Sequence, residues 1–217
     1  MGISIANFHM FELAIQHLKK DKINWSKVNM CELGNQKLNV RGNKKLEAFR
    51  TGKEYFTSIG CNHTSFDLNG IDGSVILDLS KPIQTRWKNK FNMISNCGTT
   101  EHVDNQCVVF ENIHNLCQLG GLMIHSIPIS RQWRGHCPYH YESGFPYELA
   151  KLMNYTVIYY KEECKRKQDK KTKTLLNFIL KKNDNSVQKI HDMIPGIKFS
   201  KRYKLNINNL VKVKNEK

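Results

Sequence analysis

The chain has 217 residues, of which 40% are hydrophobic and 10% aromatic, so it suits one sizeable domain and is not wholly disordered. No apolar stretch is long enough to span a bilayer, and we expect no membrane partner. The net charge of +15 is uneven: residues 161–217 hold 17 Lys and Arg against 6 Asp and Glu, whereas residues 1–160 hold 17 against 13. Such a basic region either attracts polyanions such as nucleic acid or serves as solubilising surface.

The cysteines and the start of the chain bear on its compartment. Seven cysteines, an odd number, are scattered without a repeated spacing, which is typical of thiols in a reducing environment. The first six residues lack the basic-then-apolar layout of a signal peptide. We therefore expect a cytoplasmic protein.

The first predicted elements are a helix, a strand and a second helix. Apolar residues at helical spacing predict an amphipathic helix over residues 9–20. The apolar run 28–33 predicts a buried strand that stops at a glycine, Gly34. A second helical pattern covers residues 44–59, where Gly60 is a suitable C-terminal stop.

The chain then alternates between short apolar strands and helical segments. Three of these strands end in a polar residue, namely Asp67, Asp78 or Asn96. The elements of this stretch are strands at 63–66, 74–77, 91–95 and 120–128 and helices at 104–117 and 145–153.

Residues 156–160 and 174–180 predict a pair of antiparallel strands, joined by a lysine-rich connection over 161–173. Beyond residue 182 the chain is polar and basic, with a weak strand signal at 203–211. The terminal pair brings the predicted strand count to seven.

Alternating strands and helices require a largely parallel sheet with right-handed crossovers. We therefore predict an α/β fold: a doubly wound, mostly parallel seven-stranded sheet with helices on both faces and an antiparallel terminal strand pair. The predicted divisions are a helical lead-in at 1–27, an α/β domain at 28–182 and a basic C-terminal extension at 183–217. In such a sheet the carboxyl ends of the parallel strands meet along one edge, where ligands bind.

The motifs at these strand ends, taken in order, resemble those of the class I S-adenosylmethionine-dependent methyltransferases. The resemblance covers roughly residues 28–182 and includes the terminal strand pair, which is similar to the family's reversed hairpin. The motifs that carry it are Glu32-Leu33-Gly34, Asp67, Asp78-Leu79, residues 91–96 with 99–103, and residues 120–125. It implies S-adenosylmethionine as the cofactor and methyl transfer as the activity.

The resemblance assigns the first part of the cofactor site to the first two strand ends. Glu32 and Gly34, with the adjacent Asn35, would border the methionine moiety, and Gly34 would let backbone approach where a Cβ would obstruct. Asp67 would accept hydrogen bonds from both ribose hydroxyls, for which the two oxygens of an ionised carboxylate are suited.

The remaining cofactor contacts are implied at the next two strand ends. Asp78 would lie near the exocyclic amine of the adenine, and Leu79 would lie against its ring. Asn96, Cys97 and Gly98 would line the floor where the methyl group faces the substrate. The methyl acceptor stays open at this point: a small metabolite, a sugar, a protein and a nucleic acid all fit.

Three histidines are candidates for a general base, because a histidine near its ordinary pKa takes up a proton at neutral pH. They are His102, His136 and His140. His136 and His140 lie in a loop, 129–143, which is rich in aromatic and basic residues: Arg131, Trp133, Arg134, Tyr139 and Tyr141. This loop either contacts a planar or anionic substrate or packs over the sheet edge.

The sequence also contains incomplete patterns for a zinc site and for a nicotinamide-binding site. Cys61-x-His63 and Cys137-x-x-His140 each offer two ligands and neither repeats a zinc-finger spacing, so we expect no metal. A nicotinamide dehydrogenase would need a full glycine fingerprint, whereas here Gly34 is followed by Asn35 and Gln36. The same departure leaves one alternative open, a noncatalytic nucleic-acid-binding protein on the same fold.

Overall fold

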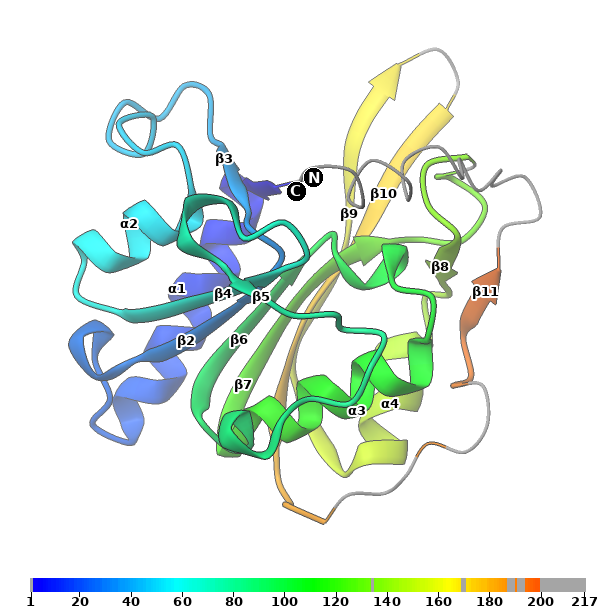
Figure 1. The fold of residues 1–217 in the computed structure, drawn as a ribbon. Helices are drawn as coiled ribbons and strands as arrows, with labels where there is room; N and C mark the ends of the chain where they lie inside the picture. The colour runs from blue at the N-terminus through cyan, green and yellow to red at the C-terminus, as the bar shows by residue number, and fades with distance from the viewer. Residues whose placement is uncertain (1, 134, 169–170, 187–189, 191–193, 200–217) are drawn as a thin grey trace, which may run out of the picture.

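The computed structural model describes residues 2–133, 135–168, 171–186, 190 and 194–199. At its centre is a seven-stranded sheet with the strand order β5-β4-β2-β6-β7-β10-β9 (Figure 1). The strands are β2 Asn29–Leu33, β4 Asn62–Asp67, β5 Val75–Ile76, β6 Phe91–Cys97, β7 Cys117–Pro128, β9 Tyr155–Gln168 and β10 Lys171–Lys182. The predicted seven-stranded α/β sheet is confirmed.

Strand direction divides the sheet into a parallel part and an antiparallel end. The strands β5, β4, β2, β6 and β7 are parallel, and β10 runs antiparallel to both β7 and β9. The chain builds outward from β2 through β4 to β5, and then returns to the other side of β2 for β6 and β7. The strand order therefore reverses between β2 and β6, which is where open α/β sheets bind ligands.

Helices cover both faces, as predicted (Figure 1). On one face α1 (Ile5–Lys20) and α2 (Gly52–Ser58) bury Phe11 and Phe56 against Met30 of β2. On the other, α3 (Gln106–Leu116) and α4 (Phe145–Met153) bury Phe110 and Phe145 against Phe178 of β10. Alternate residues of each strand thus supply two separate apolar cores.

The predicted helix at 44–59 is wrong over its first half. Residues 44–48 form turns, and α2 begins only at Gly52. The Thr51 hydroxyl accepts a hydrogen bond from the Glu54 amide (3.1 Å) and so caps the helix start. The pattern Thr51-x-x-Glu54 is the sequence signal that indicates this boundary.

The predicted connection at 161–173 is also wrong, because most of it is strand. The strands β9 and β10 continue as a hairpin, and Lys173 lies opposite Arg166 in the register. Only Leu175 to Lys181 of β10 pair with β7, so the end of the hairpin, formed by the residues of β10 before Leu175 and their partners in β9, extends beyond the sheet (Figure 1).

Two small sheets and several short helices were not predicted. In one sheet β1 (Gly2–Ser4) is parallel to β3 (Lys37–Asn39), and in the other β8 (Tyr139–Tyr141) is antiparallel to β11 (Ile197–Phe199). The 3-10 helices are η1 Trp25–Lys27, η2 Ile71–Gly73, η3 Thr85–Trp87 and η4 Thr100–His102.

The end of the described chain returns to the main core. Ile190, Ile194 and Ile197 are buried in the core that also holds α3 and α4. The strand signal at 203–211 lies outside the described residues. Among the helices that the structure describes, none is long and apolar enough to cross a membrane.

Candidate functional site

The loop that leaves β2 is held in place by hydrogen bonds that its backbone amides donate. The Gly34 amide donates to the Phe66 carbonyl of β4 (2.7 Å), and the Gln36 amide donates to Glu32 Oε1 (2.9 Å). Gly34 has a φ of +78°, and an added Cβ would lie 2.7 Å from the Gln36 side chain and 2.8 Å from that of Thr99. Any larger residue at position 34 would be strained and would collide with both side chains.

Gln36 links the carboxyl ends of β2 and β6, between which the strand order reverses. It occupies a position where the dinucleotide-binding fingerprint would have a further glycine. Its side chain is buried and donates to the Leu33 carbonyl (3.0 Å) and to Thr99 Oγ1 (2.9 Å). The Thr99 hydroxyl in turn donates to the Leu33 carbonyl (2.6 Å). The loops after β2 and β6 are therefore held together by side chains as well as by the sheet.

Asp67 lies beside this loop, at the carboxyl end of β4. Its Oδ2 accepts from the Asn35 amide (2.8 Å) and its Oδ1 accepts from the Asn69 amide (3.2 Å). The Asn35 side chain donates to Asp72 Oδ2 (2.7 Å), which ties the loop after β4 to the loop after β2. Gly34, Asn35 and Asp67 are thus brought together as the sequence predicts, and the half-buried Asp67 carboxylate retains capacity to accept further hydrogen bonds.

Asp78 follows β5 and lies close to Asp67, since the Leu77 amide donates to the Asp67 carbonyl (3.1 Å). Its Oδ1 accepts from the amide (3.0 Å) and hydroxyl (2.6 Å) of Ser80, and its Oδ2 lies 3.2 Å from Lys81 Nζ. The hydroxyl of Ser80, above all, and the adjacent Lys81 hold the pKa of Asp78 below its ordinary value.

Leu79 does not present its side chain at the edge. It is 6% exposed and belongs to the same core as Phe66. The leucine that does lie open is Leu68, directly after Asp67, at 66% exposure. Ile76, which pairs with Asp67 in the sheet register, and Ile71 of η2 are also exposed, at 72% and 58%. The sequence signal for this exposed leucine, Leu68, is its position directly after the acid at the end of β4, and the prediction of Leu79 overlooked it.

The loop after β6 is organised by Asn96, which is fully buried. Its Oδ1 accepts from the Thr99 and Thr100 amides (3.2 and 3.1 Å). Its Nδ2 bonds Thr100 Oγ1 (2.8 Å) and His125 Nδ1 (3.1 Å). Burial lowers the pKa of His125 to about 3, so this ring is neutral at pH 7. Asn96 therefore fixes the conformation of the loop through hydrogen bonds from a buried position.

The same loop is closed from the other side by Tyr141. Its hydroxyl bonds Gln106 Oε1 (2.8 Å) and Thr100 Oγ1 (3.0 Å), and its ring is fully buried. The buried Cys97 and the positive-φ Gly98 (+88°) connect β6 to this network. Cys97 and Gly98 thus lie at the carboxyl end of β6, next to Asn96.

Two of the three predicted histidines come together. The rings of His102 and His136 lie 5.4 Å apart in an edge-on arrangement. Desolvation and the adjacent His136 ring lower the pKa of His102 to about 4, and desolvation also lowers the pKa of His136. His140 is buried instead, and its Nε2 bonds the Trp133 carbonyl (2.9 Å). Trp133 and Tyr141 of the aromatic loop are buried too, so both serve packing.

The residues of the two hypothetical zinc pairs have other surroundings. His63 is buried beside Glu32, with 3.6 Å between Nε2 and Oε2, and its ring stacks on Phe56. Cys137 bonds the Tyr139 carbonyl (3.2 Å). Within the described ranges, no three His, Cys, Asp or Glu side chains converge on a point where a metal ion could bind.

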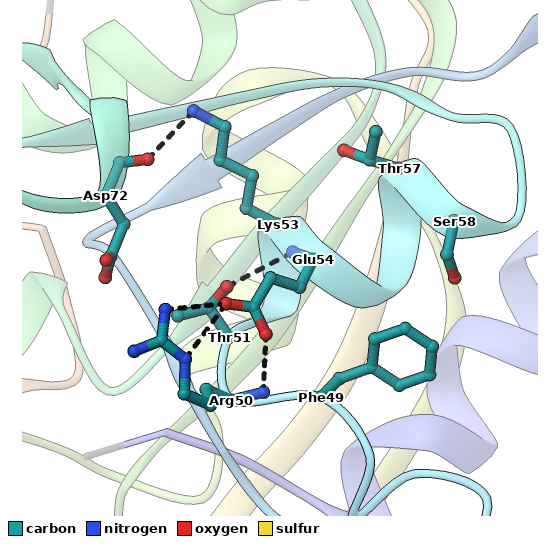
Figure 2. Close-up of a pocket in the computed structure, with 8 residues that line it drawn as sticks. All are labelled: Phe49, Arg50, Thr51, Lys53, Glu54, Thr57, Ser58 and Asp72. Carbon is teal, nitrogen blue, oxygen red and sulfur yellow. Dashed lines mark hydrogen bonds and ion pairs between the residues drawn. The ribbon is translucent and has the colours of Figure 1, made fainter.

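A separate open recess of about 660 Å³ lies along the outer side of α2 (Figure 2). It is lined by Phe49, Arg50, Thr51, Lys53, Glu54, Thr57, Ser58 and Asp72. Arg50 and Glu54 form an ion pair there (3.0 Å), and Lys53 donates to the Asp72 carbonyl (3.0 Å). Arg50 and Glu54 are thus paired with each other, and the Lys53 ammonium is engaged with the backbone.

No family model and no curated protein match this sequence. Solved structures are similar in fold. One is a 1,6-didemethyltoxoflavin-N1-methyltransferase of Burkholderia thailandensis with bound 1,6-didemethyltoxoflavin and S-adenosylhomocysteine; it is 15% identical with a TM-score of 0.53, over 81% of this chain and 78% of that one.

Two further structures widen the comparison. A Listeria monocytogenes protein assigned as an S-adenosylmethionine-dependent methyltransferase is 10% identical with a TM-score of 0.55, over 80% of this chain and 98% of that one. The [4+2]-cyclase SpnF is 8% identical with a TM-score of 0.52, over 72% of this chain and 74% of that one. At such identities the likeness concerns the fold, and a fold can support several reactions.

Proposed function

We propose that this chain, which has the fold of the class I S-adenosylmethionine-dependent methyltransferases, binds S-adenosylmethionine and transfers its methyl group to an acceptor. The observation that carries the proposal is the grouping of Gly34, Asn35 and Asp67 beside the point where the strand order reverses. That is the position at which doubly wound sheets bind nucleotide-like ligands.

The residues around Asp67 fit an adenosine moiety. The Asp67 carboxylate has acceptor capacity left for the two ribose hydroxyls, since its described partners are two backbone amides. Leu68 and Ile76, both exposed, would supply apolar surface for the adenine, in place of the buried Leu79. Asp78 would be the acceptor nearest to the exocyclic amine. We assign the methionine end to Glu32, Gly34 and Asn35 and the methyl end to residues 96–98.

When bound, S-adenosylmethionine supplies a methyl group on an already activated sulfonium, so alignment and exclusion of water can supply much of the catalysis. The chain's own part is to hold the loop after β6 in one shape, which the buried Asn96 does through four hydrogen bonds. A rigid loop keeps the acceptor in line with the methyl group.

A protic acceptor would also need a base. We assign that role to His102 on the loop after β6, with His136 beside it, because the two rings lie 5.4 Å apart and both keep solvent-exposed surface. The lowered pKa of His102 keeps its ring neutral at pH 7, although it also makes the ring a weaker base than an ordinary histidine. We do not assign it to His140, whose ring nitrogen bonds a backbone carbonyl.

Calorimetric titration with S-adenosylmethionine and S-adenosylhomocysteine tests the proposal. We expect saturable binding, and we expect Asp67→Ala to weaken it more than about tenfold, since each hydrogen bond to a charged group contributes roughly 1.5–3 kcal/mol. The matched control is Asp21→Ala, an exposed acid at the end of α1, which should leave affinity unchanged.

Two outcomes would count against these assignments. Absence of saturable binding by protein with a native circular dichroism spectrum would remove the enzyme and leave the noncatalytic alternative. Equal affinities for the Asp67→Ala and Asp21→Ala variants would remove Asp67 from the ribose site while leaving cofactor binding in place.

A further inference from the structure

The β9–β10 hairpin projects from the edge of the sheet at which the proposed site lies. The last residue of β7, Pro128, pairs with Leu175 of β10, and the residues of β10 before Leu175 pair with β9 alone. Because Pro128 is at the carboxyl end of a parallel strand, the hairpin continues past that end (Figure 1). It is therefore an arm on the site side of the molecule.

The arm is strongly basic and lacks apolar residues at its far end. Residues 161–173 contain seven Lys and Arg against three Asp and Glu, and residues 165–173 include no hydrophobic residue. The register sets Lys173 opposite Arg166. With seven basic against three acidic residues the segment has a net charge of +4, so its own acidic residues do not neutralise it.

The base of the arm is fixed to the loop that follows β7. The Thr174 amide donates to Gln132 Oε1 (2.7 Å), and the Thr174 carbonyl accepts from Trp133 Nε1 (2.7 Å) and from the Ile129 amide (3.2 Å). The Lys173 ammonium lies 5.0 Å from the centre of the Trp133 ring. The arm therefore has a defined attachment beside the site.

A row of rings connects this attachment to the loop after β6. Trp133 lies 5.3 Å from His136, and His136 lies 5.4 Å from His102, measured between ring centres. His102 belongs to η4, on the loop that Asn96 holds. His102 and His136 both keep solvent-exposed surface. The buried Trp133 thus joins the base of the arm to two exposed rings, His136 and His102, which lie toward the proposed methyl end.

This composition favours one class of partner. Protein interfaces are depleted in lysine and have an apolar centre, and stable membrane attachment takes apolar groups that enter the bilayer in addition to basic ones. The far end of the arm, residues 165–173, has lysines and no apolar residue and so suits neither. It suits the phosphates of a nucleic acid, whose bases can stack on ring side chains beyond the arm. Chemistry on a base requires that base to be outside a duplex stack, which favours a single strand.

We propose that the β9–β10 arm binds the sugar-phosphate backbone of a single-stranded nucleic acid, one base of which reaches the site beside β6 as the methyl acceptor. The proposal rests on the proposed function, because it names the substrate class of that site.

The test measures the binding of a fluorescein-labelled 20-nucleotide random-sequence RNA to the full chain by anisotropy between 50 and 200 mM KCl. The arm variant replaces Lys165, Arg166, Lys167 and Lys171 with Gln. The control variant replaces four exposed lysines at the opposite edge, Lys19, Lys27, Lys88 and Lys90, with Gln, so the change in net charge is equal. Circular dichroism and calorimetry with S-adenosylmethionine verify that both variants keep the fold and the cofactor site.

We expect the arm variant to bind RNA at least about tenfold more weakly than the control variant. The slope of log K against log salt should fall by up to about 3, since each phosphate contact on a single strand contributes about 0.7. Tritiated methyl groups from S-adenosylmethionine should enter a random-sequence RNA or single-stranded DNA pool with the native chain, and should do so less with the arm variant.

Equal RNA binding by the two variants would overturn the proposal, as would displacement of the RNA by poly-glutamate or by phosphatidylserine vesicles at equal charge. Absence of label in both nucleic-acid pools, from protein that binds S-adenosylmethionine, would overturn it while leaving the proposed function intact. Failure of the native chain to bind S-adenosylmethionine would instead overturn the proposed function.

Discussion

At the edge of the sheet formed by the carboxyl ends of the parallel strands, the polar groups beyond β4 and β5 differ in burial and bonding from those beyond β6 and β7. Beyond β4 and β5, Asp67 and Asp78 are half-buried and bond nearby amides and a hydroxyl, while apolar side chains around them lie open to solvent. Beyond β6 and β7, Asn96, Thr100 and His125 are at most 1% exposed and bond one another.

This difference indicates that one half of the edge is suited to binding a ligand and the other to holding a loop in a fixed conformation. A half-exposed carboxylate with spare acceptor capacity can take a ligand without losing an existing partner. A buried network in which each member has a partner holds a loop in one arrangement, and the loss of a member leaves the others unsatisfied in a region of low dielectric. We therefore expect substitutions beyond β6 to change stability and substitutions beyond β4 to change ligand affinity.

The largest effect is expected for Asn96→Ala. It removes four hydrogen bonds and leaves the Thr99 and Thr100 amides without the side chain that they bond, which should lower the free energy of unfolding by about 3 kcal/mol. Urea denaturation followed by circular dichroism measures this. The control, Asn24→Ala, alters an exposed asparagine and should stay within about 0.5 kcal/mol of the native chain. Similar midpoints for the two variants would show that the network beyond β6 does not stabilise the fold.

A second prediction concerns the pH dependence of the buried half. The pKa of His125 is about 3 in the folded chain against an ordinary value of 6.5, so the unfolded chain binds the extra proton between these pH values. The stability associated with this ring is complete above pH 6.5 and declines as the pH falls toward 3, by roughly 1 kcal/mol per pH unit.

The variant His125→Phe keeps a ring that can stack on Phe178 but cannot bind a proton. Between pH 6.5 and 4.5 its urea midpoint should fall less steeply than that of the native chain, whatever its stability at pH 7. Parallel slopes would show that His125 does not titrate on unfolding and would weaken the contrast between the two halves.

The smallest expected effect concerns the exposed half. Leu68→Ala should weaken the binding of S-adenosylmethionine about fivefold, because roughly 1 kcal/mol of apolar contact with the adenine is lost. Stability should change by less than about 0.5 kcal/mol, since Leu68 is exposed. The control is Leu119→Ala, a leucine of similar exposure at the start of β7, which should alter neither quantity. A loss of stability without a change in affinity would contradict the assignment of Leu68.

Much of the architecture could be predicted from the sequence because buried apolar residues recur along the chain at the spacing of a strand or of a helix. Strands β2, β4 and β6 end close to Gly34, Asp67 and Asn96, where the apolar runs stop. The start of α2 was misplaced because apolar residues at helical spacing continue through the turns before it, although the Thr51 cap sets the boundary.

Other elements could not be predicted, since their partners are distant in the sequence. The short strands β1 and β8 exist through pairing with β3 and β11, and β8 and β11 lie more than fifty residues apart. The lysine-rich segment 161–173 predicts a polar connection from its sequence, yet most of its residues pair across the hairpin. Charge predicts exposure, but it does not exclude a strand that projects from a sheet.

The sequence by itself determined the order of strands and helices and which strand ends carry an acid or a glycine, because both follow from residues adjacent along the chain. Only the tertiary structure decided which of these side chains face outward. It buried Leu79 and exposed Leu68, bonded His140 to a carbonyl and placed His136 beside His102. The physical reason is that exposure and hydrogen bonding depend on which segments pack together, and this is set by the whole sheet.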